Sequence, residues 1–462
     1  MDKLIKFRKS IMLAVKIMII AATTLGFIET WNSNYTDTLF SKNGNYVVIF
    51  SYVLILVTFS SLYGAFNIGI YRIHETIYSF SLAVVFTNLV MYLELSLIAR
   101  SLVRVAPMVL GVIYQIAVIF IGCLCANTIY FKLYSARRMV AIFGDDQTGF
   151  ALINKMSRIP ERFKIECGIN ANTTDMKEIK KLIDKYEAVV ICDIDKNLEK
   201  EIFSYCYTNC KRTYLLPAIT DIIINSSYEI QISDTPVLMS RNRGLTTEQE
   251  LIKRCMDILI SSVGIIITSP IMLICAIAIK LDDGGPIFFK QNRITKNGRI
   301  FNVLKFRSMV VDAEKDGAQK ATEHDSRITK VGKIIRACRA DELPQLFNVL
   351  RGDMSMVGPR PERIENVYEY SQQYPEFELR HRVKAGLTGY AQLYGKYNTS
   401  PEDKLNMDLI YIETYSLLQD IKLLILTFKI LFMRESTEGF DSSANSNVKK
   451  AESLKEKKTE NK

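Results

Sequence analysis

Histidine is scarce in this 462-residue chain, which contains three: His74, His324 and His381. Three scattered histidines leave little room for a histidine-based metal site. The nine cysteines are also scattered, and the nearest pairs match neither a zinc nor a thioredoxin spacing. We therefore expect reduced thiols in a protein that faces the cytoplasm.

A cleavable signal peptide is not evident, because the first apolar stretch lacks a small-residue cleavage site and further apolar stretches follow it. Acidic residues are outnumbered: 49 Asp and Glu stand against 59 Lys and Arg, a formal net charge of +10. This excess suits an anionic partner, such as lipid headgroups, nucleotide phosphates or nucleic acid. Hydrophobic residues make up 48% of the chain, which favours membrane segments.

Four long apolar runs fill the first 131 residues: Ile11–Ile28, Tyr46–Phe66, Ile77–Ala99 and Ala106–Phe131. Each is close to the ~20 residues that a helix needs to cross a bilayer. Basic residues precede the first run, which places the N-terminus in the cytoplasm. We predict a membrane protein of α plus α/β class, with four transmembrane helices in residues 1–135.

Residues 136–250 read as a soluble α/β domain. Apolar strands are expected at 139–144 and 187–193, with a helix at 173–186 between them. The turn after the first strand, "GDDQTG", has Asp146 where a dinucleotide fingerprint needs glycine. We predict a degenerate Rossmann-like domain with a structural or regulatory role, rather than nucleotide binding.

A second kind of apolar segment runs from Lys253 to Lys280. Ser269 and Pro270 interrupt it at the midpoint, and proline removes a helix hydrogen bond, so the Ser269 hydroxyl can bond the freed carbonyl. Basic residues flank both ends, beginning with Lys253 and Arg254, so the positive-inside rule puts both ends on one face, where we expect these residues to reach anionic headgroups. We predict a re-entrant helix at 254–281 that enters and leaves one leaflet. An ordinary kinked fifth crossing is the alternative.

The last folded unit is predicted at 251–433. Its segment 284–309 reads as strands and turns rich in basic residues, and 415–432 reads as an apolar helix suited to the membrane interface. The end of the chain, 434–462, is polar and poor in hydrophobic residues, so we predict a disordered tail.

Two adjacent carboxylates, Asp341 and Glu342, stand two residues before Pro344. Proline favours the first turn of a helix, so we predict a helix from Pro344 to Leu350, with Leu343 outside helical geometry. A helix cap accounts for one acid, worth about 1 kcal/mol, but not for two. Carboxylates among arginines suit phosphate chemistry, because acids hold Mg²⁺ or attack phosphorus and arginines hold phosphate oxygens.

Further basic residues in the same unit are candidates for binding a phosphorylated substrate. They are Lys305 and Arg307 in "LKFRSM", Arg336 before the carboxylate pair, and Arg360 in "VGPRP", where Pro359 and Pro361 limit its backbone. Each of these signals is weak alone, since a solvated arginine explains most of them. Together with the neighbouring apolar segment they favour phosphoryl transfer at a bilayer surface.

These motifs resemble the bacterial sugar transferases, also called polyprenyl-phosphate hexose-1-phosphate transferases or monotopic phosphoglycosyl transferases. The resemblance runs from about Lys253 to Phe432 and includes "GGPIFFKQNR", "FNVLKFRSM", "ITKVGKIIRACRADELPQLFNVLRGDMSMVGPRP" and "RHRVKAGLTGYAQLYG". The N-terminal half resembles the long members, which have four membrane helices and a Rossmann-like domain. Two departures are visible: the family commonly has Pro at Ala385 and Trp at Tyr390.

The resemblance implies an enzyme that transfers a sugar-1-phosphate from a UDP-sugar to undecaprenyl phosphate and releases UMP. Asp341 would be the nucleophile, and Asp341 and Glu342 would be the metal residues, with Glu342 helping to hold Mg²⁺ or to position groups. Pro359, Arg360 and Pro361 would help to hold the nucleotide. The C-terminal α+β domain would be the catalytic one, and Ser269 and Pro270 would mark the break in the re-entrant helix.

The resemblance also implies a place and partners. The protein would be a multi-pass protein of the bacterial inner membrane with a cytoplasmic catalytic domain, starting exopolysaccharide, capsule or O-antigen synthesis. Its partners would be the UDP-sugar, undecaprenyl phosphate and the bilayer, without nucleic acid, and self-association stays open. Glucose, galactose or an N-acetylated sugar all fit, and a hexose is favoured because long members often use one.

Two other functions are compatible with parts of the sequence. The chain could be a membrane scaffold or sensor with an inactive transferase unit, although the intact Asp341–Glu342 pair counts against this. It could also be an ordinary glycosyltransferase, which would release UDP instead of UMP.

Overall fold

The computed structural model describes residues 7–35, 42–144, 147–240, 244–311, 313, 325–395 and 399–431. The chain divides into two compact units, Met1–Pro217 and Ala218–Lys462. The turn with Asp146 and the predicted disordered tail at 434–462 lie outside the described residues. Both therefore stay predictions.

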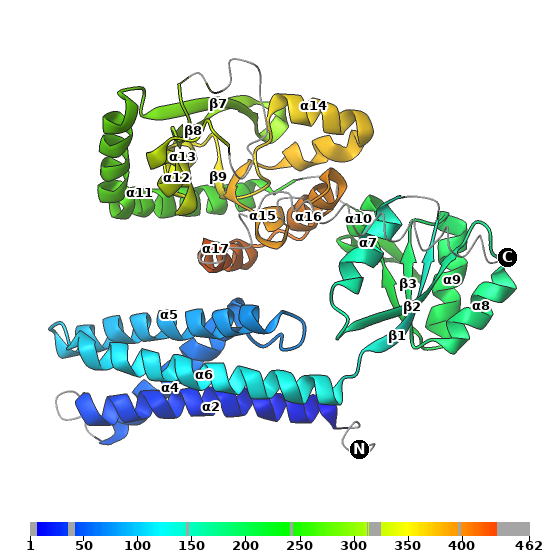
Figure 1. The fold of residues 1–462 in the computed structure, drawn as a ribbon, viewed down its shortest axis with the longest axis horizontal. Helices are drawn as coiled ribbons and strands as arrows, with labels where there is room; N and C mark the ends of the chain where they lie inside the picture. Colours follow the sequence, from blue (N-terminus) through cyan, green and yellow to red (C-terminus); the bar gives the residue numbers. More distant parts are fainter. Residues whose placement is uncertain are drawn as a thin grey trace. The chain divides into compact units, whose positions relative to one another are not determined.

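The first unit begins with four long helices: α2 (Arg8–Asn34), α4 (Lys42–Leu62), α5 (Ile73–Ala99) and α6 (Val105–Leu133). They coincide with the four predicted apolar runs and pack as a bundle, in which α6 contacts α2 and α5 (Figure 1). Large apolar side chains such as Leu13, Phe50 and Ile113 point outward. A bundle with an apolar exterior suits lipid rather than water.

An α/β region follows in the same unit. Its parallel sheet has the strand order β2-β1-β3-β4. The strands are β1 (Arg137–Phe143), β2 (Phe163–Asn170), β3 (Ala188–Cys192) and β4 (Arg212–Leu215), and the helices are α7 (Gln147–Ser157), α8 (Met176–Lys185) and α9 (Lys196–Thr208). This confirms the predicted α/β class. The compact unit that holds this sheet ends at Pro217, and the domain boundary predicted at residue 250 stays a prediction.

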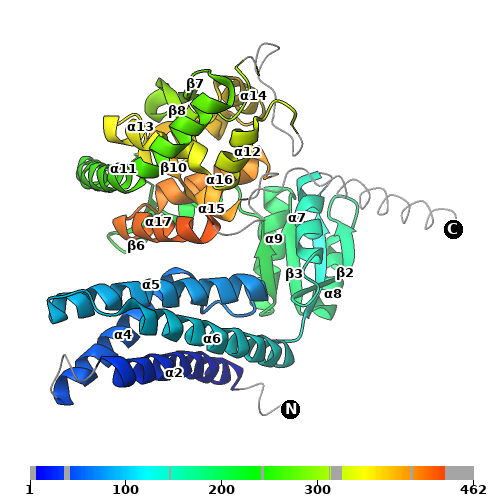
Figure 2. The ribbon, with the colours of Figure 1, turned by 60° about the vertical axis from the view of Figure 1, so that its left-hand side comes forward.

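The second unit combines helices with short strand pairs. Its elements are α10 (Ile219–Asn225), β5 (Tyr228–Ile232), β6 (Thr235–Met239), α11 (Thr247–Asp283), β7 (Phe288–Ile294), η1 (Lys296–Gly298), β8 (Ile300–Phe306), α12 (Lys330–Ala337), η2 (Ala340–Glu342), α13 (Gln345–Arg351), β9 (Ser355–Val357), α14 (Ile364–Gln373), η3 (Pro375–Arg382), β10 (Gly386–Thr388), α15 (Tyr390–Tyr394), α16 (Pro401–Glu413) and α17 (Leu417–Leu431). Figure 2 shows the same unit from another side. One apolar core joins β8, α13, β9, α16 and α17.

The helix α11 is the longest element of this unit, with 37 residues. A capping box formed by Thr246 and Gln249 begins it, and Gly284, with a φ of 71°, ends it. Pro270 lies inside the helix. The Ser269 hydroxyl donates to the carbonyl of Ile266 at 2.8 Å, which is the carbonyl that proline leaves without a backbone donor. The expected bond between Ser269 and a freed carbonyl is therefore confirmed.

Both ends of α11 pack against the same unit. In its first half, Asp257 accepts a 2.8 Å hydrogen bond from the backbone N–H of Met356. In its second half, Met272 and Ile279 pack against a core that includes Phe306. Between these contacts the helix exposes a run of large apolar side chains: Ile266, Ile267, Ile271, Leu273 and Ile274.

Five helices in the described part of the chain are long and apolar enough to cross a membrane: the four of the N-terminal bundle and α11. The chain is accordingly a membrane protein. Neither the four crossings nor the re-entrant path of α11 follows from helix length and composition alone, so both stay predictions.

Candidate active site

The carboxylate pair lies in a short 3₁₀ turn, η2, which leads directly into α13. Leu343 has helical backbone angles (φ −55°, ψ −37°), so the prediction that it leaves helical geometry was wrong. The physical reason is local bonding: the N–H of Leu343 donates to the carbonyl of Ala340 at 3.2 Å, which offsets the usual preference before proline. α13 ends at Gly352, with a φ of 92°, where a left-handed residue is needed.

Glu342 is held by two cations from different elements. Lys305, on β8, donates to its Oε1 at 2.8 Å, and Arg360, on the loop after β9, donates to the same oxygen at 3.2 Å. Although burial by itself would raise the pKa of Glu342, the charges of Lys305 and Arg360 hold it well below its usual range. Glu342 is thus a fixed negative charge at neutral pH.

The pKa of Asp341 is shifted in the opposite direction, upward. Burial raises the pKa of its carboxyl, and the neighbouring negative charge of Glu342 raises it further, while Lys305 and Arg336 oppose the increase. Two adjacent carboxyls with pKa values pushed apart can take different roles in one reaction. Here Glu342 is the permanently ionised member and Asp341 is the more basic one.

A polar cavity opens beside the pair. It is lined by Arg293, Val303, Lys305, Glu342, Gln345, Arg360, Pro361, Gly386, Leu387 and Gln392. The structure therefore brings together four residues singled out from the sequence: Lys305, Glu342, Arg360 and Pro361. It adds Arg293, Gln345 and Gln392, which sequence reasoning did not select. The tertiary fold alone reveals them, because they come from β7, α13 and α15.

The loop that carries Arg360 continues directly from β9. The N–H of Gly358 donates to the carbonyl of Thr388 at 2.8 Å, and the N–H of Gly386 donates to the carbonyl of Pro359 at 2.8 Å. A side chain at Gly358 or Gly386 would collide with backbone atoms of the facing strand. These close approaches fix the start of the loop, so Arg360 projects from a rigid base.

Residues 248–434 match the sequence model of the bacterial sugar transferase family. A UDP-glucose:undecaprenyl-phosphate glucose-1-phosphate transferase from Caulobacter vibrioides is 38% identical over 192 residues, which is 40% of this chain and 72% of that protein. The chain belongs to the bacterial sugar transferase family. The carboxylate pair, the cavity and the Arg360 loop all lie within the matched residues.

Other relatives of this family resemble the chain over less of their own length. A UDP-N-acetylgalactosamine-undecaprenyl-phosphate N-acetylgalactosaminephosphotransferase from Aeromonas hydrophila is 44% identical over 183 residues, 39% of this chain and 43% of the relative. A UDP-glucose:undecaprenyl-phosphate glucose-1-phosphate transferase from Klebsiella pneumoniae is 38% identical over 234 residues, half of each chain. The chain thus spans about half the length of these relatives.

Arg307 was a candidate substrate ligand, but it is not among the residues that line the cavity. It is 7% exposed, its guanidinium makes a bidentate ion pair with Asp283, and its Nε donates to the carbonyl of Pro286 at 2.6 Å. These contacts attach the end of α11 to the end of β8. The Arg307 guanidinium is thus occupied by α11 and the residues after it, whereas Lys305 reaches Glu342.

The remaining sequence candidates differ in how closely they approach the pair. Arg336 lies in the last turn of α12, where its charge lowers the pKa of Asp341. Pro359 is buried, and Pro361 lines the cavity. Arg360 remains half-exposed, with 48% of its side chain accessible. A half-exposed guanidinium beside a cavity can contact a ligand while it holds Glu342.

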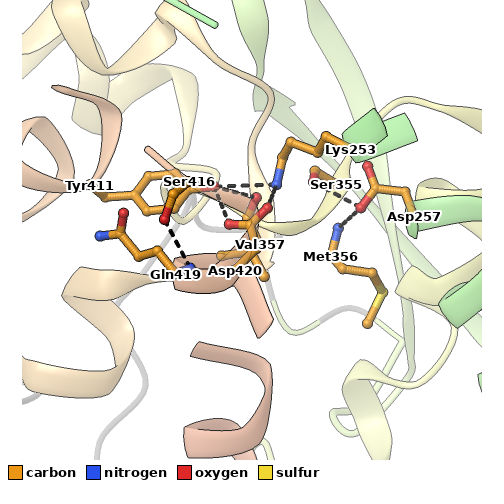
Figure 3. Close-up of polar contacts among 9 residues, drawn as sticks. All are labelled: Lys253, Asp257, Ser355, Met356, Val357, Tyr411, Ser416, Gln419 and Asp420. Carbon is orange, nitrogen blue, oxygen red and sulfur yellow. Dashed lines mark hydrogen bonds and ion pairs between the residues drawn. The ribbon is translucent and has the colours of Figure 1, made fainter. Parts of the chain in front are cut away.

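The two basic residues assigned to the membrane helix face protein instead of lipid headgroups. Figure 3 shows Lys253 beside Asp420 of α17, with Nζ 2.5 Å from Oδ2, and Tyr411 donating to the other oxygen of Asp420 at 2.8 Å. Arg254 donates to the carbonyls of Val349 and Leu350 at 2.7 Å each. The expectation that both reach headgroups was therefore wrong: they satisfy buried carboxylate and helix-end carbonyl groups.

Two carboxylates are few for a metal site. The described residues contain no group of three or more His, Cys, Asp or Glu side chains that could hold a metal ion. Oε1 of Glu342 already accepts from two cations. Mg²⁺ commonly binds one or two carboxylates and completes its octahedron with phosphate oxygens and water. Asp341 and Glu342 fit that kind of site, in which the substrate supplies the remaining ligands.

Proposed function

We propose that the protein transfers a sugar-1-phosphate from a UDP-sugar to undecaprenyl phosphate and releases UMP. The observation that carries this proposal is the pair of adjacent carboxyls with opposite pKa shifts, of which Glu342 lines a polar cavity together with Lys305 and Arg360. The names of the relatives from Caulobacter, Klebsiella and Aeromonas support it, because all three describe transfer to undecaprenyl phosphate.

In the first step, a carboxylate oxygen of Asp341 attacks the phosphorus that carries the sugar. The bond between this phosphorus and the oxygen that bridges the two phosphates breaks, and UMP leaves with the bridging oxygen. The product is a phospho-sugar joined to Asp341. The raised pKa of Asp341 makes its carboxylate more basic than an ordinary aspartate, while Arg360 and Lys305 stabilise negative charge on the phosphates.

In the second step, a phosphate oxygen of undecaprenyl phosphate attacks the same phosphorus. The bond to Asp341 breaks, and the carboxylate is restored. Two separate steps let the soluble and lipid substrates use the same carboxylate in turn. Mg²⁺ held by Asp341 and Glu342 would neutralise part of the diphosphate charge during this chemistry.

The topology that suits this reaction is a re-entrant α11 with both ends in the cytoplasm of a bacterial inner membrane. Both ends of α11 contact the same unit as Asp341, which a helix crossing to the other side could not do without carrying part of that unit with it. The exposed apolar middle of α11 would enter one leaflet. The carboxylate pair would then stand close to the depth of the lipid phosphate.

The sugar is proposed to be a hexose. The relatives' names include glucose and N-acetylgalactosamine, and a Streptococcus agalactiae relative, 41% identical over 193 residues, is named a galactosyl transferase. Linking such a sugar to undecaprenyl diphosphate would begin the synthesis of an exopolysaccharide, capsule or O-antigen unit.

The test uses the purified full-length protein in lipid nanodiscs with undecaprenyl phosphate, Mg²⁺ and a panel of UDP-sugars. We expect UMP release with at least one UDP-hexose, dependent on the lipid phosphate for multiple turnovers. Release of UDP would support an ordinary glycosyltransferase instead. The absence of any nucleotide release across the panel would favour a scaffold or sensor with an inactive transferase unit.

A further inference from the structure

The loop that carries Arg360 is held by arginines as well as by backbone bonds. Nη2 of Arg380 donates to the carbonyl of Arg360 at 3.0 Å, and Nη1 of Arg293 donates to the carbonyl of Pro361 at 3.0 Å. Pro359 and Pro361 have no backbone N–H, so this loop cannot be fixed by its own donors alone. Its position therefore depends on donors that approach its carbonyls.

Arg380 is fully enclosed by protein. Its side chain is 2% exposed, and the same Nη2 donates to Oδ2 of Asp408 at 2.6 Å, whose side chain is 1% exposed. The guanidinium lies over the ring of Phe377, 4.8 Å from its centroid. Arg380 comes from η3 and Asp408 from α16, so two elements fix the donor. Because both side chains are buried, neither can touch a substrate in the cavity.

The charges around Arg380 are balanced. Oε1 of Glu362 lies 4.0 Å from Nη1 of Arg380 and 3.8 Å from Nζ of Lys404. Two cations therefore face the two carboxylates of Asp408 and Glu362. A buried cluster whose charges are balanced does not suit binding of an anionic ligand. What the cluster does instead is hold neighbouring backbone in place.

We propose that Arg380 and Asp408 are positioning residues that hold the backbone of Arg360 so that its guanidinium reaches Glu342. Contacts run without a gap from Asp408 to Arg380, from Arg380 to the carbonyl of Arg360, and from the Arg360 side chain to Glu342. This inference rests on the proposed function only in its effect on turnover. The geometry of the loop can be tested without turnover.

The consequence for catalysis follows from distance. Arg360 is 3.2 Å from Oε1 of Glu342, already near the outer end of hydrogen-bond range. Loss of the carbonyl anchor would let the loop move, and a displacement of about 1 Å can cost about 100-fold in rate. Of the two cation contacts of Glu342, the one with Lys305 would then remain to hold that carboxylate.

The first experiment compares Arg380→Lys and Asp408→Asn with the wild type, in the full-length protein in nanodiscs. A lysine keeps the charge, but its side chain is one bond shorter, so its ammonium cannot take the place of Nη2, which donates to both Asp408 and the Arg360 carbonyl. We expect kcat for UMP release to fall about 10- to 100-fold, with Asp408→Glu recovering part of the loss. The matched control is Arg382→Lys, because Arg382 lies two residues after Arg380 and its guanidinium pairs with Glu413 of α16 instead of the loop.

A double-mutant cycle separates positioning from a general structural effect. If Arg380 acts through Arg360, then Arg380→Lys should cost much less in an Arg360→Lys background than in the wild type. An equal loss in both backgrounds would overturn the proposal. If Arg380→Lys cannot be purified, Asp408→Asn takes its place in the same cycle.

Hydrogen exchange provides a readout that does not need activity. In Arg380→Lys we expect faster exchange at Gly358 and Gly386, whose N–H groups fix the base of the loop, with unchanged exchange in the first half of α11. Unchanged exchange at the loop, or a uniform increase across the unit, would overturn the positioning role. If the wild type releases no UMP, the proposed function fails, and the exchange result still decides this inference.

Discussion

Lys305 donates a 2.8 Å hydrogen bond to Glu342, and this contact separates the properties of two carboxyls that are adjacent in the sequence. Lys305 lowers the pKa of both acids, but Glu342 has the direct bond and a second cation in Arg360. Asp341 has no such bond from Lys305, and burial is the largest influence on its pKa. The direct bond from Lys305, the second cation Arg360 and the burial of Asp341 together make the pair chemically asymmetric.

The asymmetry predicts opposite shifts in the acid limb of the pH profile. Asp341 acts as a carboxylate, so the rate falls as pH drops through its pKa. Lys305→Met removes a charge that lowers this pKa, so the acid limb of kcat/KM should move to higher pH. Glu342→Gln removes a charge that raises it, so the limb should move to lower pH. Lys290→Met, on the exposed side of β7, is the control. Shifts in the same direction for both variants would contradict this account.

Replacing Asp341, the proposed nucleophile, should abolish transfer. Asp341→Asn leaves the shape of the side chain nearly unchanged but removes the attacking carboxylate, and we expect UMP release to fall by roughly 10³-fold or more. Mass spectrometry of the wild type with a UDP-sugar and no lipid acceptor should detect a phospho-sugar adduct that Asp341→Asn lacks. Asp353→Asn, which alters the half-buried partner of the exposed Arg299, should retain both. Substantial turnover by purified Asp341→Asn would refute the nucleophile role.

Arg307 should matter for stability rather than chemistry. Arg307→Met removes the bidentate pair with Asp283 and leaves the carbonyls of Pro286 and Met309 without their donor. We expect a loss of roughly 2 kcal/mol in unfolding free energy, seen as a lower midpoint of thermal unfolding. The kcat of the folded protein should stay near the wild-type value. A large fall in kcat without loss of stability would instead support a substrate contact.

The buried pair between α11 and α17 should behave differently when one or both partners are removed. Lys253→Met leaves the carboxylate of Asp420 buried without its cation, which should cost about 3–5 kcal/mol. Lys253→Met combined with Asp420→Leu replaces the pair by apolar groups and should recover much of this loss. Thermal unfolding of the three proteins measures the difference. A double variant less stable than Lys253→Met would contradict the prediction.

The path of α11 can be tested by labelling intact cells with a membrane-impermeant thiol reagent. After removal of the native cysteines, single cysteines are placed at Asp234 and at Lys290, both exposed positions on either side of α11. For a re-entrant helix we expect both to stay protected until the cells are opened. Pro270→Ala should bias the segment toward crossing. Labelling at Lys290 alone in intact cells would show a fifth crossing.

Local sequence was enough to predict the N-terminal helices and part of the α/β sheet. The apolar runs became α2, α4, α5 and α6 because each run is long and its side chains are apolar on all sides. The alternation of strand and helix became a parallel sheet for a similar reason: β1 and β3 are short apolar runs between helical segments. The bond from Ser269 to Ile266 was also predictable, since proline frees a specific carbonyl four residues earlier.

Contacts between distant segments could not be predicted in the same way. Lys305 and Arg307 differ by two positions, yet one reaches Glu342 and the other is enclosed with Asp283, because β8 ends between them. Leu343 stays helical because the turn before it closes on Ala340. Lys253 and Arg254 read as headgroup ligands only while their partners, which lie about 100 or more residues away, are unknown.

The sequence by itself determined the carboxylate pair, the membrane-type helices and the rigid backbone around Arg360, because these depend on residue type and short spacing. The tertiary structure alone decided which cations meet which acids. Charge pairing depends on distances of a few ångströms between segments far apart in the chain, and burial sets how strongly each pair acts. The contrast between Asp341 and Glu342, and the line of contacts from Asp408 to Glu342, exist only once those segments have packed.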